Sequence, residues 1–238
     1  MWELRTTALG RILVPPRVPG GFAVFATSLD FEGRINPAIG ITIAEVIRQE
    51  FGIDAALVTC TQIHSATVTR AKRDETWREC DACDALWSDE SHVAIGIKVA
   101  DCLPITMIDP TQRVIANVHS GWRGAVQRIA AETLDALERE TSFNTANALA
   151  YLGPSIRSCC FEVGEEVATQ FDETFLDRSR AKPHVDLIAY TVAMLESRGI
   201  SADRISDSGV CTRCDGSIFH SYRRAGKGGG RNLQIVAQ

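Results

Sequence analysis

The sequence lacks the features that would place the protein in a membrane or on a nucleic acid. No uninterrupted apolar run approaches the roughly 20 residues of a membrane-spanning helix. Neither sign of charge dominates, since 25 Lys and Arg stand against 30 Asp and Glu for a net charge of -5. This balance favours neither nucleic acid nor an anionic membrane as a partner. Residues 1–10 carry Glu3 and Arg5 and lack the apolar block of a secretory signal, so we expect a cytoplasmic protein.

Cysteine is the residue type that needs an explanation. With 238 residues, 45% hydrophobic and 23% charged, the chain otherwise has the composition of an ordinary globular protein, and we expect a single domain over residues 1–238. Its eight cysteines are not expected to form disulfides in a reducing compartment. Some are therefore candidate metal ligands or nucleophiles, and the others are small buried apolar side chains.

Apolar periodicity predicts a mixture of strands and helices. Strands are expected at residues 22–26, 57–60, 66–70, 93–99, 103–108, 114–119 and 148–152. Helices are expected where apolar residues recur every three or four positions, at residues 41–51, 126–137 and 186–198. Two apparent hairpins among the strands favour an α/β fold of the α+β type, with mixed β-sheets packed in layers and covered by helices.

Three side chains that can bind a metal follow or end predicted strands. His64 lies in a turn-like segment, Cys102 lies between two apolar strands, and His119 ends a third strand. Two nitrogens and one sulfur would leave the fourth position of a tetrahedral zinc open, as in catalytic sites, where the metal activates water or polarises a substrate oxygen. The spacing alone equally fits buried His and Cys side chains without a metal.

Two segments are candidate anion sites. The turn from Gly121 to Gly124 leads from a strand into a helix and places backbone N–H groups beside Arg123, although it could also be only a tight turn. The tail at residues 221–231 concentrates cations and could clamp phosphate, although a solvated basic loop is the simpler interpretation. It lacks the Gly-Lys-Ser/Thr ending of a Walker loop.

The remaining cysteines and histidines carry weaker signals. The Cys-x-x-Cys pairs at 80/83 and 211/214 could together form a second, structural zinc site, if the fold brings them together. The adjacent Cys159 and Cys160 are interpreted as core or chance. His92, His184 and His220 are expected to be surface or packed side chains.

Several sequence blocks, in order from about residue 57 to the end, resemble the YfiH/YlmD laccase-domain family. The blocks are Gln62-Ile63-His64, Ala100-Asp101-Cys102-Leu103-Pro104, Val118-His119-Ser120-Gly121-Trp122-Arg123-Gly124, Leu152-Gly153-Pro154-Ser155-Ile156, Cys160-Phe161-Glu162-Val163-Gly164, Cys211-Thr212 and Phe219-His220-Ser221-Tyr222-Arg223-Arg224. The resemblance implies a layered α/β fold and zinc bound by His64, Cys102 and His119. It also implies phosphorolysis of adenosine, inosine, guanosine and methylthioadenosine, and deamination of adenosine.

The sequence departs from the family near its N-terminus. The family usually has Ser/Thr-Thr-Arg-Gly-Gly-Val-Ser and Ser-Leu-Asn-Leu blocks, and residues 25–34 match neither. The glycine that usually follows the first histidine is Ser65. Because the missing arginine is a possible contact for the substrate anion, the departure bears on substrate and rate, and leaves the three proposed ligands untouched.

The leading hypothesis is a zinc-dependent purine nucleoside enzyme acting on a nucleoside and phosphate. Its phosphate and substrate contacts would come from the turn and the tail, at Arg123, Tyr222, Arg223, Arg224 and Arg231. Asp101 would carry a proton during deamination, in a catalytic set with Cys102 and His119.

Three alternatives remain at this stage. Cys102 and His119 could be a nucleophile–base pair for amide or acyl transfer. The protein could bind a nucleoside or a metal without turnover. It could also be a copper-dependent polyphenol oxidase, the family's older label, since Cu²⁺ competes well for such ligands. Five histidines are too few for a blue copper site plus a trinuclear cluster.

Overall fold

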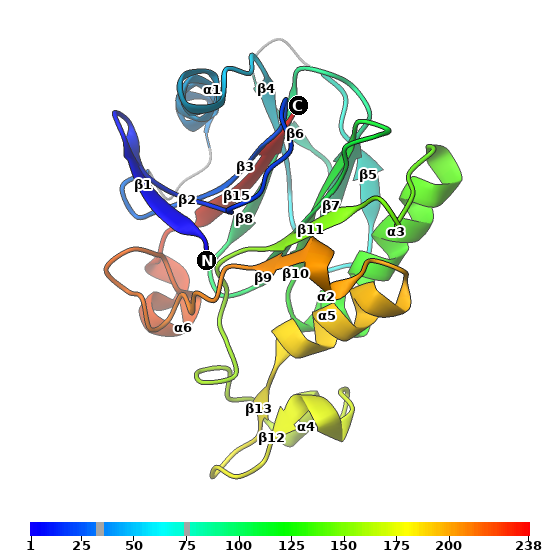
Figure 1. Cartoon of the computed structure of the whole chain (residues 1–238). Helices are drawn as coiled ribbons and strands as arrows, with labels where there is room; N and C mark the ends of the chain where they lie inside the picture. Colours follow the sequence, from blue (N-terminus) through cyan, green and yellow to red (C-terminus); the bar gives the residue numbers. More distant parts are fainter. Residues whose placement is uncertain (32–35, 74–76) are drawn as a thin grey trace.

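Two β-sheets lie face to face in the computed structural model, which describes residues 1–31, 36–73 and 77–238 (Figure 1). The seven-stranded sheet has the order β1 (Glu3–Thr7), β2 (Gly10–Val14), β3 (Ala23–Thr27), β15 (Asn232–Ala237), β8 (Val93–Val99), β4 (Ala56–Cys60), β6 (Trp77–Cys80). The six-stranded sheet has the order β14 (Ile205–Asp207), β11 (Leu149–Leu152), β9 (Leu103–Asp109), β10 (Val114–Ser120), β7 (Ala85–Ser88), β5 (Val68–Arg70). Both sheets are mixed, because β4 runs parallel to β6 and β8, β5 to β7, and β11 to β14.

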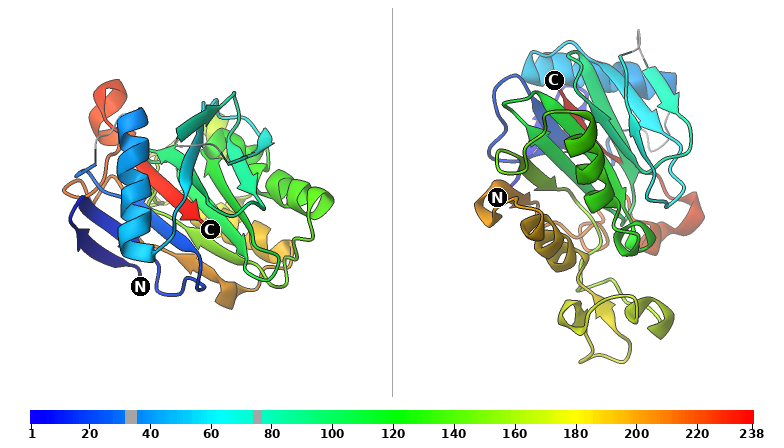
Figure 2. Two further views of the ribbon diagram at one scale, coloured as in Figure 1. Left: turned by 90° about the horizontal axis from the view of Figure 1, so that it is seen from above. Right: turned by 90° about the vertical axis from the view of Figure 1, so that its right-hand side faces the viewer.

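Helices cover the outer faces of the two sheets. Helix α1 (Pro37–Phe51) packs on the seven-stranded sheet, and α3 (Ile129–Glu140) and α5 (Leu187–Ser197) pack on the six-stranded sheet (Figures 1 and 2). A small lobe holds α4 (Glu165–Ala168), the 3-10 turn η1 (Glu173–Phe175), β12 (Leu176–Asp177) and β13 (His184–Val185), and it projects from the sheets in Figure 1. The other short helices are α2 (Trp122–Val126), η2 (Ala202–Arg204), α6 (Tyr222–Ala225) and η3 (Gly226–Gly228).

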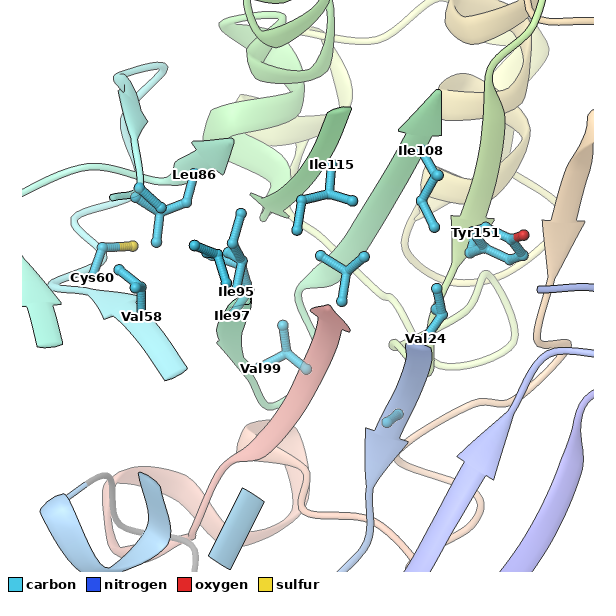
Figure 3. Close-up of a cluster of buried hydrophobic side chains, with 14 of the residues drawn as sticks. Val24, Val58, Cys60, Leu86, Ile95, Ile97, Val99, Ile108, Ile115 and Tyr151 are labelled. Atoms are coloured by element: carbon cyan, nitrogen blue, oxygen red, sulfur yellow. The ribbon is translucent and has the colours of Figure 1, made fainter. Parts of the chain in front are cut away.

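Strand alternation separates the apolar side chains into layers. In β3, Ala23 and Phe25 face α1, whereas Val24 and Ala26 face the second sheet. The layer between the sheets, part of which is shown in Figure 3, is built from buried aliphatic side chains of both sheets. Burial of this kind is the main favourable term in folding.

The predicted fold class is confirmed, and most predicted elements lie within a few residues of those observed. The strand expected at 93–99 is β8 with the same bounds. Helix α1 begins earlier than expected, at Pro37, because the side chain of Asn36 accepts a hydrogen bond from the Ile39 amide (3.0 Å). The helix expected at 126–137 is α3, which begins at Ile129 because Arg128 before it has a φ of 60°, and Val126 is instead the last residue of the short helix α2. In the divergent N-terminal block, residues 32–34 lie outside the described residues. Within the described ranges, no helix is long and apolar enough to cross a membrane.

Candidate functional site

Four chain segments meet at one end of the sheet pair. They are the loop after β4, the turn before β7, the connection between β8 and β9, and the end of β10. The β8–β9 connection crosses from one sheet to the other, which places Asp101 and Cys102 between them. The register pairs Ser120 with Leu103, so Cys102 lies beside the end of β10, where His119 is.

The structure brings together the three residues that the sequence singled out as metal ligands. One ligand atom from each of His64, Cys102 and His119 lies within 4.8 Å of the others. Cys102 Sγ is 3.9 Å from His64 Nε2, and the two imidazole rings meet edge to face with centroids 4.9 Å apart. The described residues could therefore hold a metal ion at this point.

A buried carboxylate that the sequence analysis did not identify organises this group. Asp84, fully buried, accepts a hydrogen bond from His119 Nδ1 (2.8 Å). It also accepts from the amides of Ile63 (3.2 Å), His64 (2.9 Å) and Ser65 (2.6 Å) and from the Ser65 hydroxyl (2.8 Å). Because Nδ1 of His119 is engaged, Nε2 is the nitrogen that faces Cys102. Asp84 thus fixes both the loop that carries His64 and the ring of His119.

Opposite charges are favoured on the members of this group. Burial raises the pKa of Asp84, but hydrogen bonds from His119 and Ser65 outweigh it and hold that pKa below its usual range. Burial likewise opposes the charged forms of Cys102 and His119. Their mutual hydrogen bond and the partners His64 and Asp84 outweigh it, lowering the pKa of Cys102 to about 6 and raising that of His119 to about 9. The thiolate form of Cys102 is the form that binds metals and attacks electrophiles.

Gly121 leaves the space that the sulfur occupies. A Cβ at this position would lie 2.9 Å from Cys102 Sγ and 3.3 Å from His64 Cδ2. We expect Gly121→Ala to displace the sulfur and lower the affinity of this site for zinc by about 10-fold or more, as changes just outside a metal's ligands do. The measurement is zinc titration against a competing chelator. Gly20→Ala is the matched control, since nothing lies within 4 Å of its added Cβ, and equal affinity in the two variants would contradict the expectation.

The group opens into a cavity of about 680 Å³, a size typical of small-molecule sites. Its lining combines aromatic and cationic side chains, and Arg223 lies over the Phe161 ring (5.9 Å to the centroid) and Arg231 over the Tyr222 ring (6.0 Å). The lining residues are Thr61, Gln62, His64, Lys98, Ala100, Asp101, Cys102, His119, Arg123, Ile156, Phe161, Tyr222, Arg223 and Arg231. The cavity therefore offers positive charge and apolar ring faces beside the candidate metal ligands.

Of the four arginines predicted to contact substrate, three line the cavity. Arg123 lies over the Trp122 ring at 4.2 Å and makes no ion pair within the described ranges. Arg223 donates to the carbonyl of Glu162, and Arg231 to two glycine carbonyls. Arg224 is different: its guanidinium donates to the carbonyls of residues 212, 213 and 219 and does not line the cavity. We therefore assign Arg224 to holding the tail in place.

Asp101 lines the cavity, but both of its carboxylate oxygens are engaged. One accepts from the Thr212 hydroxyl (2.7 Å) and the other from the Arg223 amide (2.6 Å), at the start of α6. Tyr222, which is 46% exposed, comes next to Arg223 and also lines the cavity. The tail expected to be a flexible loop thus begins with a short helix tied to Asp101.

The structure corrects the hypothesis that the two Cys-x-x-Cys pairs share a metal. Cys211 and Cys214 gather instead with Cys159 and Cys160, with sulfur atoms all within 4.8 Å of one another. The pair at positions 80 and 83 lies in the layer between the sheets. The interpretation of the adjacent cysteines as core holds for Cys160, which is buried in an apolar cluster, and not for Cys159, which is exposed. The loops after β11 and β14 bring both of them to the second pair.

The chain has curated relatives, and solved structures share its fold. Residues 41–238 match the family described as multi-copper polyphenol oxidoreductase laccase, and the chain belongs to this family. It is 34% identical over 205 residues to adenosine deaminase RL5 of an unknown prokaryotic organism, covering 79% of this chain and 77% of that protein. It is 29% identical over 177 residues to a purine nucleoside phosphorylase of Clostridium acetobutylicum, covering 74% of each. YlmD from Geobacillus stearothermophilus shares the fold, with a TM-score of 0.84 at 21% identity over 99% of this chain and 98% of that one.

Proposed function

We propose that the protein is a zinc-dependent purine nucleoside enzyme. It would carry out phosphorolysis of adenosine, inosine, guanosine and methylthioadenosine, and deamination of adenosine. The observation that carries the proposal is the His64–Cys102–His119 group at the base of a cationic and aromatic cavity. Curated relatives named adenosine deaminase and purine nucleoside phosphorylase support the substrate class.

The donor set fits zinc. Two imidazoles and one thiolate are ligands that zinc prefers, and three protein ligands are the number found in catalytic sites. The bond from His119 Nδ1 to Asp84 leaves Nε2 for the metal, and Gly121 leaves room at the sulfur. A zinc ion held there would act as a Lewis acid toward water or a purine substituent.

The cavity walls match the charge changes of phosphorolysis. In that reaction a phosphate oxygen forms a bond to C1′ as the bond from C1′ to the purine N9 breaks, and the sugar gains oxocarbenium character. Arg123, Arg223 and Arg231 would bind and orient the phosphate, because guanidinium groups pair with its oxygens in a fixed fork. Phe161 and Tyr222 offer ring faces to the purine. The chain's part is therefore mainly positioning and charge stabilisation.

For Asp101 we propose a positioning role in place of the proton carrier suggested by the sequence. Its two oxygens already accept hydrogen bonds from Thr212 and Arg223, so it fixes the start of α6 and the arginine there. The hydrogen bond from the Arg223 amide also holds that residue at the cavity wall, and Asp101 itself directly precedes Cys102 in the chain.

Chromatography of adenosine incubated with zinc-loaded protein, with and without phosphate, tests the proposed function. We expect adenine and ribose 1-phosphate only when phosphate is present, and inosine in either buffer. Folded, zinc-bound protein that forms no product in either buffer would overturn the enzyme assignment and leave a protein that binds without turnover.

Arg123 gives a sharper test of the phosphate site. We expect Arg123→Ala to raise the KM for phosphate about 10–100-fold, because hydrogen bonds to charged groups contribute about 1.5–3 kcal/mol. Deamination needs no phosphate and should change much less. Lys227→Ala is the control, because Lys227 is an exposed cation of the tail at residues 221–231 that does not line the cavity. An unchanged KM in Arg123→Ala would remove this arginine from the phosphate site.

A second candidate rests on the same geometry. Cys102, His119 and Asp84 stand in the order of a nucleophile, a base and an orienting carboxylate, which suits amide or acyl transfer.

Copper-dependent phenol oxidation is less well supported. Nδ1 lies 2.7 Å from a backbone carbonyl oxygen in His92 and 2.6 Å from one in His184. In the described part of the chain, none of the groups that could hold a metal ion contains His92, His184 or His220.

A further inference from the structure

Four cysteines gather at a second place, outside the lining of the cavity. Cys159 and Cys160 lie in the loop that leads from β11 into the small lobe, and Cys211 and Cys214 lie in the loop that leads from β14 toward α6 (Figure 1). Two of the side chains are buried and two are exposed, and all four are free thiols. None of them lines the cavity or takes part in the proposed function.

The sulfur atoms have the spacing of a tetrahedral metal site. Cys214 Sγ is 3.9 Å from Cys159 Sγ and 3.4 Å from Cys160 Sγ, and all four lie within 4.8 Å of one another. With zinc–sulfur bonds of about 2.3 Å, neighbouring sulfurs of a tetrahedron lie about 3.8 Å apart. A disulfide would need about 2.05 Å. The cluster therefore needs only small movements to enclose one ion.

A cation lies beside the sulfurs. Arg213 Nη1 is directed at Cys160 Sγ (3.5 Å). A positive charge at this distance favours the thiolate form of a cysteine, which is the form that binds a metal.

We propose that Cys159, Cys160, Cys211 and Cys214 form a closed tetrathiolate zinc site with a structural role. Four thiolates fill all positions of a tetrahedral zinc, so no position is left for a substrate. Zinc binding here cross-links two loops that are about 50 residues apart in the chain, and this stabilises the folded state over the unfolded one. The claim does not depend on the proposed nucleoside activity.

The two loops clamped by this site also form walls of the cavity. Thr212, inside the Cys-x-x-Cys turn, donates to Asp101, and Arg223 donates to the carbonyl of Glu162 in the other loop. Phe161 follows Cys160 directly and lines the cavity. The second metal would thus hold the aromatic and cationic walls in register without touching a substrate.

Zinc counting tests the proposal. Protein purified under reducing conditions should contain about two zinc ions per chain, one for each group. Cys214→Ser and Cys102→Ser should each lower the content to about one, and Cys80→Ala, a cysteine outside both groups, should keep about two. In Cys102→Ser, X-ray absorption should show zinc with sulfur neighbours alone, and its melting temperature should fall when a strong chelator is added.

The outcomes separate the two metal sites without any assay of activity. A zinc content unchanged by Cys214→Ser, or zinc in Cys102→Ser with nitrogen neighbours, would overturn the proposal. So would iron in the cluster, or a disulfide between any two of the four cysteines. If Cys214→Ser does not fold, Cys159→Ser replaces it, since that side chain is also exposed.

Discussion

Replacing Cys102 with serine is expected to remove the metal from the cavity and nearly all nucleoside turnover. The sulfur lies between His64 and His119, and a neutral hydroxyl is a poor substitute for a thiolate. Loss of a residue that merely orients a ligand lowers metal affinity about 10–100-fold, so loss of a ligand should cost more than about 100-fold. We expect kcat/KM for adenosine phosphorolysis at limiting zinc to fall by at least the same factor. Chelator competition and product chromatography measure the two effects.

Two further variants, Cys80→Ala and Cys102→Asp, serve as comparisons for this prediction. Cys80→Ala should keep both zinc affinity and turnover at this site, since Cys80 lies in the layer between the sheets. Cys102→Asp removes the nucleophile but keeps a possible ligand, and should retain some zinc-dependent activity. Metal-free wild-type protein that remains active, and an inactive Cys102→Asp variant, would instead support the nucleophile–base mechanism. Full activity in Cys102→Ser would exclude both the zinc mechanism and the nucleophile–base mechanism, because each requires the sulfur of Cys102 for full activity.

Several strands and the positions of the three candidate ligands were predictable because their signals are local. The strands β8, β9 and β10 have 7 residues each, and the apolar residues that predominate in each are enough to identify strands. The start of helix α1 also has a local signal, because asparagine followed by proline, as at Asn36, is common at the start of a helix. The apolar pattern alone suggested a later start. Strand ends are where side chains from different segments can meet, so His64 and His119 were reasonable candidates.

Asp84 and the four-cysteine cluster could not be found in this way because their partners are distant in the chain. Asp84 contacts His119, which is 35 residues away in the sequence, and the amide of His64, which is 20 residues away. No spacing pattern predicts either contact. Cys160 and Cys214 are 54 residues apart. Only the folding of two separate loops beside the small lobe brings them together, whereas the two similar Cys-x-x-Cys motifs suggested a different pairing.

Asp84→Asn should have the second large effect, on both stability and metal affinity. The carboxylate accepts five hydrogen bonds, from three amides, the Ser65 hydroxyl and His119. An asparagine of the same shape has one acceptor oxygen, and its NH₂ group would face donors. Because removing one partner of a buried charged pair costs about 3–5 kcal/mol, we expect a fall of that order in the free energy of unfolding. Zinc affinity should fall about 10–100-fold, since His119 loses its orienting partner.

The two effects can be separated by the conditions of measurement. Denaturant unfolding with a strong chelator present reports the loss of the Asp84 hydrogen bonds alone, because no metal then contributes to either protein. Zinc titration of the folded variant reports the orientation of His119. Asp81→Asn is the matched control, since Asp81 is exposed in the same turn, and both quantities should stay near wild type. If Asp84→Asn unfolded like Asp81→Asn but bound zinc 10–100-fold less tightly, Asp84 would act on the metal ligands and contribute little to the fold. Wild-type zinc affinity in Asp84→Asn would show instead that His119 keeps its orientation without this carboxylate.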